Sequence, residues 1–180
     1  MKATGIVRRI DDLGRIVIPK EIRRTLRIRE GDPLEIYTEK DGEVIFKKYS
    51  PMGDLEGFAG EICESLHKTI GASCAICDRD GVIAAAGSRR RELLEKSISP
   101  ALERVMENRG VYVQGEGGAP LAVTDAADSP EAALAAPILS AGDVMGCVVL
   151  LPQEGRPKPG ETERKLAEMV AGFLGRQMEE

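Results

Sequence analysis

Four basic side chains gather within a few turns of the chain, at Lys20, Arg23, Arg24 and Arg27. On a helix that advances about 100° per residue, all four fall within one arc of roughly 100°. Ile22 and Leu26 fall on the adjoining face, which is then the buried one. No acidic residue lies within the basic arc, whereas acids usually alternate with bases on a surface helix stabilised by ion pairs. The pattern therefore favours nucleic-acid binding over an ordinary solvated face.

Arginine outnumbers lysine around this helix, and Arg8, Arg9 and Arg15 precede it. The planar guanidinium group suits paired contacts with phosphate oxygens or guanine edges. Adjacent residues of a strand point to opposite faces, so only one of Arg8 and Arg9 shares the surface of the helix unless the strand is bulged. The basic residues thus predict a nucleic acid as partner.

The charge is divided unevenly along the 180 residues, whose net charge is −5. Residues 1–50 hold 12 Lys+Arg and 9 Asp+Glu, a net charge of +3, and within residues 1–29 the net charge is +6. The remainder carries −8. Such asymmetry indicates an anionic partner at the front of the chain.

Enzyme chemistry has little support in the sequence. The only histidine, His67, lies in an apolar-periodic helix, and the glycine-rich segment at residues 115–118 lacks the Lys-Ser/Thr ending of a phosphate-binding loop. No nucleophile motif of the Gly-x-Ser-x-Gly kind occurs. We expect no catalytic site and no cofactor.

The four cysteines lie among apolar neighbours, at Cys63, Cys74, Cys77 and Cys147. Cys74 and Cys77 form a CxxC pair, but a structural zinc site needs four ligands and no second pair exists. A redox CxxC would begin a helix, whereas residues 72–77 have the pattern of a strand. Reduced, buried thiols and no metal are the expectation.

The front of the chain is predicted to be a strand, a turn, a second strand, a short helix and a hairpin. These elements are expected at residues 4–10, 11–14, 16–18, 20–26, and 34–38 with 44–48. Asp41-Gly42 is a strong hairpin signal. Fifty residues of this kind bury little apolar surface without disulfides, metal or oligomerisation, so we expect an intertwined homodimer through residues 1–50.

A second domain follows a linker at residues 51–55 and occupies residues 56–180. Helices are expected at residues 54–70, 100–110 and 161–178, with Gly71 and Ser99 as caps, and strands at residues 72–77, 82–86, 111–113, 121–123, 134–139 and 145–151. An antiparallel sheet flanked by helices, in the α+β class, fits this order. A basic cluster, Ser88-Arg89-Arg90-Arg91, is either a solvated loop or a contact with DNA, an anionic ligand or another domain.

No apolar run is long enough to span a bilayer, and the beginning of the chain does not have the pattern of a signal peptide. We therefore expect no membrane partner and a cytoplasmic, nucleoid-associated protein.

The run of residues 1–26, MKATGIVRRIDDLGRIVIPKEIRRTL, resembles the N-terminal domain of AbrB-type transition-state regulators. Together with a second domain of about 125 residues, the whole chain is similar to the stage V sporulation protein T family. The resemblance implies a swapped-hairpin head in which two chains interleave. It also implies double-stranded DNA as the partner. The positions of the family's main DNA contacts are occupied here by Arg8, Arg15, Arg23 and Arg24, to which we add Arg9 and Lys20 as weaker contacts.

The rear domain resembles a GAF domain, a small-molecule sensor fold, most clearly over residues 136–150. The resemblance implies homotetramers in which GAF domains pair two head dimers, and the apolar helices at residues 54–70 and 161–178 are candidate surfaces. A small-molecule effector is the other partner that the resemblance implies. Residues 113–133 would line its pocket but depart from the family, so the resemblance does not identify the effector, and the domain can also serve for assembly alone.

We predict a DNA-binding transcription regulator, both activator and repressor, of sporulation genes. The first alternative is an antitoxin-like protein, because the same head fold neutralises toxins. The second is a ligand-sensing module with incidental affinity for DNA.

Overall fold

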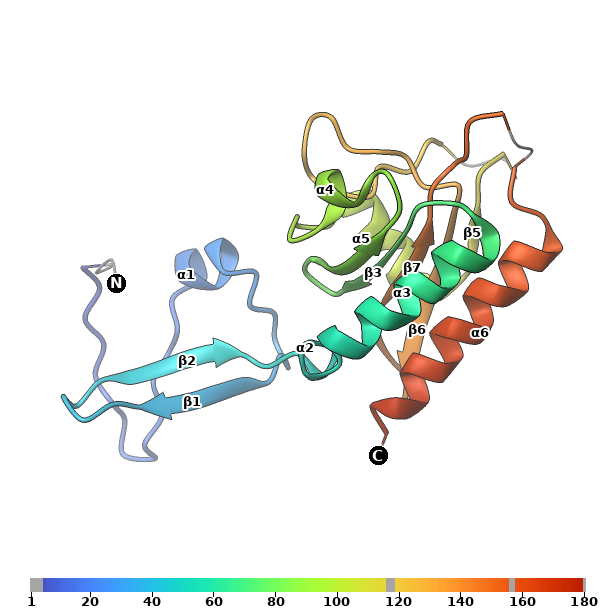
Figure 1. Cartoon of the computed structure of the whole chain (residues 1–180). Helices are drawn as coiled ribbons and strands as arrows, with labels where there is room; N and C mark the ends of the chain where they lie inside the picture. The colour runs from blue at the N-terminus through green and yellow to red at the C-terminus, as the bar shows by residue number, and fades with distance from the viewer. Residues whose placement is uncertain (1–4, 116–118, 156–157, 180) are drawn as a thin grey trace. The chain divides into compact units, whose positions relative to one another are not determined.

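In the computed structural model, residues 5–115, 119–155 and 158–179 are described, and the chain divides into two compact units, Met1–Tyr49 and Ser50–Glu180 (Figure 1). Its elements, in chain order, are α1 (Lys20–Thr25), β1 (Leu34–Thr38), β2 (Val44–Lys48), α2 (Pro51–Asp54), α3 (Glu56–Ile70), β3 (Cys74–Asp78), β4 (Val82–Ala86), α4 (Arg90–Leu93), α5 (Pro100–Glu107), β5 (Tyr112–Val113), β6 (Leu134–Ser140), β7 (Asp143–Leu150) and α6 (Glu161–Gln177). The glycine-rich segment noted in the sequence has residues 116–118 outside the described residues.

The first unit consists of α1 and an antiparallel hairpin, β1–β2, which pairs Thr38 with Val44 at its closed end. The predicted hairpin is confirmed at both strands. Strands were predicted at residues 4–10 and 16–18, but residues 5–10 and 16–18 have no strand assignment in the structure. The predicted turn between them is confirmed, because the Gly14 amide donates to the Asp11 carbonyl oxygen at 3.0 Å.

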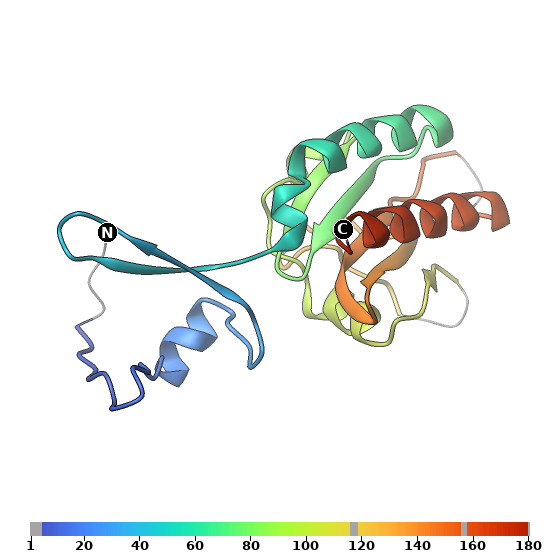
Figure 2. The same ribbon diagram turned by 90° about the horizontal axis from the view of Figure 1, so that it is seen from below.

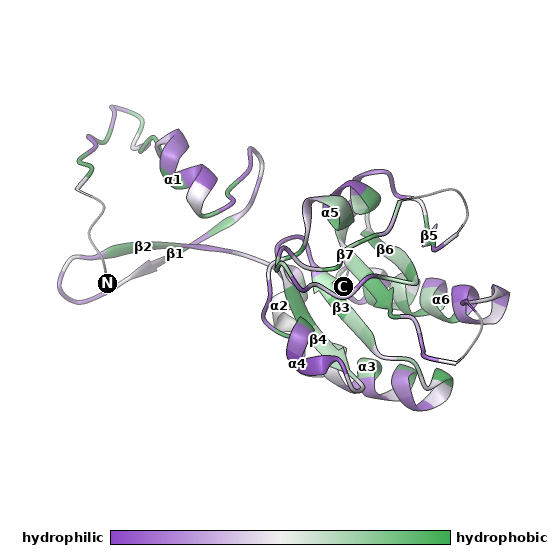
Figure 3. Cartoon of the chain, turned by 90° about the horizontal axis from the view of Figure 1, so that it is seen from above, coloured by the Kyte–Doolittle hydropathy of each residue, from purple (hydrophilic) through white to green (hydrophobic). Residues whose placement is uncertain are grey.

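The second unit is built on a five-stranded antiparallel sheet with the order β4-β3-β7-β6-β5. α3 and α6 cover one face of this sheet, and α4 and α5 lie on the other (Figure 2). Each face has its own buried aliphatic cluster, and the strands between them are strongly apolar (Figure 3). The predicted α+β class is confirmed. The strand expected at residues 121–123 is reduced to one isolated bridge, between Ala122 and Glu131.

Residues 51–55, predicted as a linker, instead begin the second unit. Pro51 starts the single turn of α2, and Met52 is fully buried in the cluster beneath α3. Proline is favourable at a first helical position because its missing amide hydrogen has no partner there in any case. The chain therefore enters the second unit through its core.

The CxxC pair is divided between the two faces of the sheet. Cys74 lies in the α3–α6 cluster, next to Cys63, and Cys77 lies in the opposite cluster, directly across from Cys147 on β7. Residues three apart on a strand point to opposite sides, so these two thiols cannot bind one metal. All four cysteines are free and buried, and no group of three or more metal-ligating side chains occurs among the described residues.

Candidate nucleic-acid interface

α1 carries three of the six predicted DNA contacts. Lys20 and Arg24 are exposed, and Arg23 is half-buried. The helix follows Pro19, whose φ of −58° suits a helix start, and it has no buried residue of its own. Figure 3 shows it as largely hydrophilic. A short helix presented in this way offers its cations to a partner rather than to the interior of the chain.

The helix ends earlier than predicted, and this changes the role of Arg27. α1 ends at Thr25, and Arg27 has a positive φ of 52°. Its amide donates to the Arg24 carbonyl oxygen, while the Ile28 amide donates to that of Arg23 at 2.7 Å. Arg27 therefore lies in the left-handed turn that closes the helix and does not share the arc of Lys20, Arg23 and Arg24.

The hairpin holds the end of α1 in place. Lys48 Nζ on β2 donates to the Arg27 carbonyl oxygen at 2.8 Å and lies 3.5 Å from Asp32 Oδ2. The same carboxylate oxygen accepts the Arg29 amide at 2.8 Å, and the Asp32 side chain is only 6% exposed. These contacts fix the loop between helix and hairpin. Sequence reasoning missed them because both residues look like ordinary surface charges.

Arg15 follows a tight turn that its own side chain stabilises. Asp11 Oδ1 accepts the amides of Leu13 and Arg15, at 3.0 and 2.8 Å, and Asp11 Oδ2 accepts Arg15 Nε at 2.8 Å. Hydrogen bonds from the Arg15 amide and guanidinium lower the pKa of the Asp11 carboxyl. The pairing leaves the Arg15 side chain 69% exposed, so its outer nitrogens remain accessible to a partner.

Arg8 and Arg9 lie apart from α1 in the chain, in a segment without assigned secondary structure, and both are exposed. Because no strand is assigned at these residues, the structure does not test the prediction that their side chains point to opposite faces of a strand. One further feature marks Arg23: its Nε is buried without a hydrogen-bond partner among the described residues. A buried guanidinium nitrogen without a hydrogen bond is energetically unfavourable.

The front unit lacks a hydrophobic core within one chain. Both buried apolar clusters of the described residues consist of residues at Met52 or beyond. The large apolar side chains of the first unit are exposed instead, among them Ile6, Val7, Ile10, Leu13, Ile16, Val17, Leu26, Ile36, Val44 and Phe46. Val7 is 89% and Val17 is 73% exposed. So much exposed aliphatic surface on one small unit marks a site of association.

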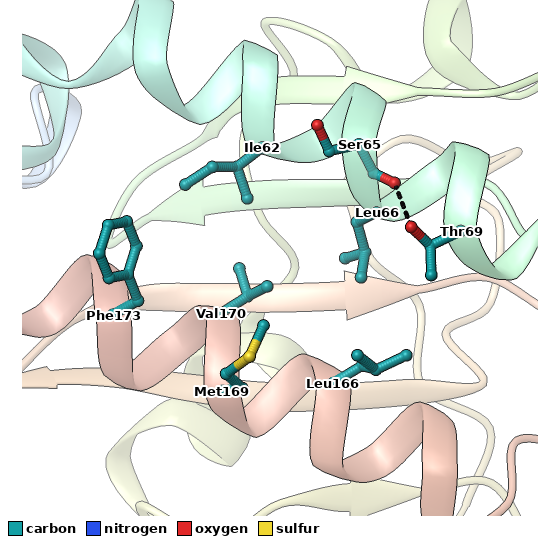
Figure 4. A pocket seen from close by; sticks show the side chains of 8 residues that line it. All are labelled: Ile62, Ser65, Leu66, Thr69, Leu166, Met169, Val170 and Phe173. Carbon is teal, nitrogen blue, oxygen red and sulfur yellow. Dashed lines mark hydrogen bonds between the residues drawn. The ribbon is translucent and has the colours of Figure 1, made fainter.

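A second apolar surface lies between α3 and α6. A groove of about 320 Å³ is lined by Ile62, Ser65, Leu66, Thr69, Leu166, Met169, Val170 and Phe173 (Figure 4). Thr69 turns its hydroxyl away from the groove by donating to the Ser65 carbonyl oxygen at 2.8 Å. Met169 and Phe173 are 61% and 46% exposed on its rim, and the Phe173 ring lies 5.7 Å from that of Phe58.

Among the described residues no helix is long and apolar enough to cross a membrane.

Comparison with known proteins agrees with this division of the chain. Residues 54–179 match the family described as "Stage V sporulation protein T C-terminal, transcription factor", and residues 7–54 match "Antidote-toxin recognition MazE, bacterial antitoxin". The stage V sporulation protein T of Bacillus subtilis is 51% identical over the full length of both chains. The transition state regulatory protein AbrB of the same organism is 47% identical over 76 residues, which cover 42% of this chain and 77% of that protein.

Among solved structures, the GAF domain of a phosphoenolpyruvate-protein phosphotransferase from Coxiella burnetii covers 69% of this chain and 82% of its own. The TM-score is 0.55 at 16% sequence identity, so the likeness concerns the fold alone. The predicted GAF fold of the rear unit is thereby confirmed. With its full-length relative and its matching rear domain, the chain belongs to the stage V sporulation protein T family of transcription factors.

Proposed function

We propose that the protein regulates sporulation genes by binding double-stranded DNA through Arg8, Arg9, Arg15, Lys20, Arg23 and Arg24. The observation that carries this proposal is the exposed basic side of α1, where Lys20 and Arg24 lie. Arginine-rich surfaces of this size contact mainly phosphates, so we expect sequence preference to come largely from DNA shape. The same protein would activate some genes and repress others, as a nucleoid-associated regulator in the cytoplasm.

The binding unit would be an intertwined homodimer formed by residues 1–50. The exposed aliphatic side chains of residues 5–17 and the missing core of the first unit support it. Residues 5–10 and 16–18 have the sequence pattern of strands but no strand assignment in one chain, and pairing with a second chain would supply the missing neighbours. Val7→Lys/Val17→Lys tests the dimer, because both side chains are already in solvent in one chain. We expect the double variant to halve the mass of the full-length assembly in light scattering, because only the rear units would still associate, and an unchanged mass would contradict the front dimer.

The rear unit would join two such dimers into a tetramer through the α3–α6 groove, with a second copy of this chain as occupant. Met169 and Phe173 are large apolar side chains exposed on its rim, which is unfavourable in a free monomer. Met169→Lys/Phe173→Lys should lower the mass of the assembly from tetramer to dimer. Glu168→Lys, on the other side of α6, is the matched control and should leave the tetramer intact. Assembly is the role of the rear unit that this groove favours, and effector sensing is the alternative.

DNA binding is tested by fluorescence anisotropy across a salt series. If about eight phosphates are neutralised per dimer, the log-log salt slope is near −7. Arg23→Ala/Arg24→Ala removes four cations per dimer, so the slope should fall in magnitude by about 3 to 4 and the affinity should collapse. Lys40→Ala/Lys47→Ala, which removes as many charges from the hairpin, should retain most of the affinity. Unchanged binding by the arginine variant would refute the assignment of this site.

An antitoxin-like function remains the second candidate, because residues 7–54 also match a family of bacterial antitoxins. That role predicts a stable complex with a toxin partner through the front unit. Co-purification of a ribonuclease at fixed stoichiometry, together with equal affinity for promoter and random DNA, would favour the antitoxin over the regulator.

A further inference from the structure

Three consecutive arginines, Arg89, Arg90 and Arg91, stand on the surface of an otherwise acidic unit. They lie between β4 and α5, where a bend leads into the single turn of α4. We call residues 87–93, which include α4, the arginine turn. Residues 51–180 carry only 13 basic against 21 acidic side chains, and three of the 13 are adjacent here. All three are exposed. The concentration of like charge at one point requires a physical account.

The backbone of the arginine turn is fixed at its beginning by Ser73. Gly87 has a φ of 95°, and a Cβ added there would lie 2.5 Å from Ser73 Oγ, so only glycine fits. The Ser73 hydroxyl shares a hydrogen bond with Ser88 Oγ at 3.4 Å and accepts one from the Arg89 amide at 3.4 Å. Ser73 itself is only 8% exposed. The turn thus rests directly on a buried residue.

The other end of the turn is anchored by packing and by backbone hydrogen bonds. Leu93 is fully buried in the cluster on the α5 side of the sheet. Just beyond it, the Glu95 amide donates to the Val82 carbonyl oxygen at 3.0 Å, and the Lys96 amide donates to that of Leu93 at 3.1 Å. The arginines therefore project from an ordered backbone, which lowers the entropy lost when they bind a partner.

The charges of the turn are only partly compensated. Arg89 pairs with Glu92 at 2.6 Å, and both side chains are more than 40% exposed. Arg90 and Arg91 have no carboxylate within 4.0 Å among residues 5–115, 119–155 and 158–179. Two guanidinium groups thus keep their donors available to an anion.

We propose that Arg90 and Arg91, with Arg89 beside them, form a second DNA contact, which binds phosphates flanking the site held by the front unit. This proposal rests on the DNA binding proposed above. An open, exposed cationic turn suits the continuous backbone of a duplex, whereas a small anion would be held in an enclosed pocket. The contact is independent of base sequence, because it reaches only the backbone.

The net charge of −8 explains why such a contact would depend on the front unit. An acidic unit is repelled by free DNA, so three arginines do not bind a duplex alone at physiological salt. Once the front unit holds DNA, the tether raises the effective concentration of duplex near the turn into the range where weak contacts are occupied. The arginine turn would thus extend the footprint of a bound regulator without recruiting it.

The experiment compares two duplexes with the full-length protein, again by anisotropy across a salt series. One duplex has about 20 base pairs, two turns of B-DNA, and the other about 60. We expect Arg90→Ala/Arg91→Ala to weaken binding to the long duplex about fivefold or more. The slope should fall in magnitude by about 0.9 for each phosphate that the variant no longer neutralises. Binding to the short duplex should stay within twofold of wild type.

Three comparisons decide the outcome. Lys68→Ala/Lys158→Ala removes the same charge from exposed positions elsewhere on the unit and should leave both affinities unchanged. Arg90→Lys/Arg91→Lys keeps the charge and should retain the salt slope. The second contact would be overturned by any of three results. These are equal weakening in the lysine-to-alanine control, equal weakening of the arginine variant on both duplexes, and unchanged binding of the arginine variant to the long duplex. If wild type binds neither duplex in a salt-dependent way, the proposed function itself fails, which is a separate result.

Discussion

The hydroxyl of Ser50 donates a hydrogen bond to Oδ2 of Asp78 at 3.1 Å. Ser50 is the first residue of the second unit, and Asp78 ends β3. The other oxygen of the same carboxylate accepts the amides of Asp80 and Gly81, both at 2.8 Å. One side chain thus shapes the β3–β4 turn and also ties it to the point where the chain enters the second unit.

Asp78→Ala should therefore destabilise the second unit more than Ser50→Ala. Removal of the carboxylate leaves two amides and one hydroxyl without their acceptor, and we expect a loss of about 1–3 kcal/mol. Ser50→Ala removes one hydrogen bond and should cost about 1 kcal/mol or less. Urea unfolding followed by far-UV circular dichroism measures both. Asp128→Ala, at an exposed aspartate, is the control, and a loss there equal to that of Asp78→Ala would contradict the role of the carboxylate.

Two glycines of α6 should respond to alanine with opposite signs. A Cβ at Gly175 would overlap the carbonyl oxygen of Leu139, whereas a Cβ at Gly172 would meet no atom within 4 Å. Gly175→Ala must push α6 away from β6, and we expect it to destabilise the unit by about 1–3 kcal/mol. Gly172→Ala improves helix propensity in an exposed position and should stabilise it by about 0.5–1 kcal/mol. Thermal unfolding of the two variants in parallel tests the packing, and equal signs would refute it.

The N-cap of α5 is a third point of sensitivity. Ser99 Oγ accepts the Leu102 amide at 2.9 Å and donates to the Ala122 carbonyl oxygen at 2.6 Å, and the residue is only 4% exposed. Ser99→Ala removes the cap and leaves a carbonyl oxygen unsatisfied, so we expect a loss of about 1–3 kcal/mol. Ser99→Thr retains the hydroxyl and should recover most of this in the same urea titration. If threonine is as harmful as alanine, crowding at the site and not the hydrogen bonds determines its stability.

The thiols should be unreactive in the folded protein. All four cysteines have no exposed surface, and burial raises the pKa of the Cys77 and Cys147 thiols above the usual range. A hydrogen bond with the Cys74 thiol, together with burial, likewise raises the pKa of Cys63. The same hydrogen bond lowers the pKa of Cys74, so this thiol is protected by its lack of exposed surface. Because thiolates are the reactive species, we expect negligible labelling by an aromatic disulfide reagent at pH 8 until the chain unfolds. In guanidinium chloride all four should react. Rapid labelling of any one in the native state would show that its side of the sheet opens.

Local signals in the sequence predicted elements of both units well. Gly71 ends α3 with a φ of 74°, and Ser99 caps α5 just before Pro100, both as expected. The hairpin was found at its observed strands because Asp41-Gly42 determines the turn locally, with Gly42 at a φ of 80°. In each of these places one or two residues decide the backbone conformation, and no distant partner is needed.

The failures occurred where pairing or packing is not local. The β-branched residues before α1 have the pattern of strands, but residues 5–18 have no strand assignment in the structure. The sequence marks Pro51 as a boundary, and nothing nearby reveals that Met52 is buried in a core formed far along the chain. For the interface, composition identified the arginines but not Lys48 on β2 or Asp32 in the loop before β1, which hold the end of α1.

The absence of a core before Met52 has a consequence for synthesis. The synthesis of the first unit is finished while the 131 residues of the second unit are still to be translated, which takes roughly 7 to 26 s at bacterial rates. Throughout this interval its aliphatic side chains can be covered only by another molecule, either a chaperone or a chain emerging from a neighbouring ribosome on the same messenger. Subunits made close together on one polysome would thus meet before either is released, and the pairing of heads would reflect where the chains were translated.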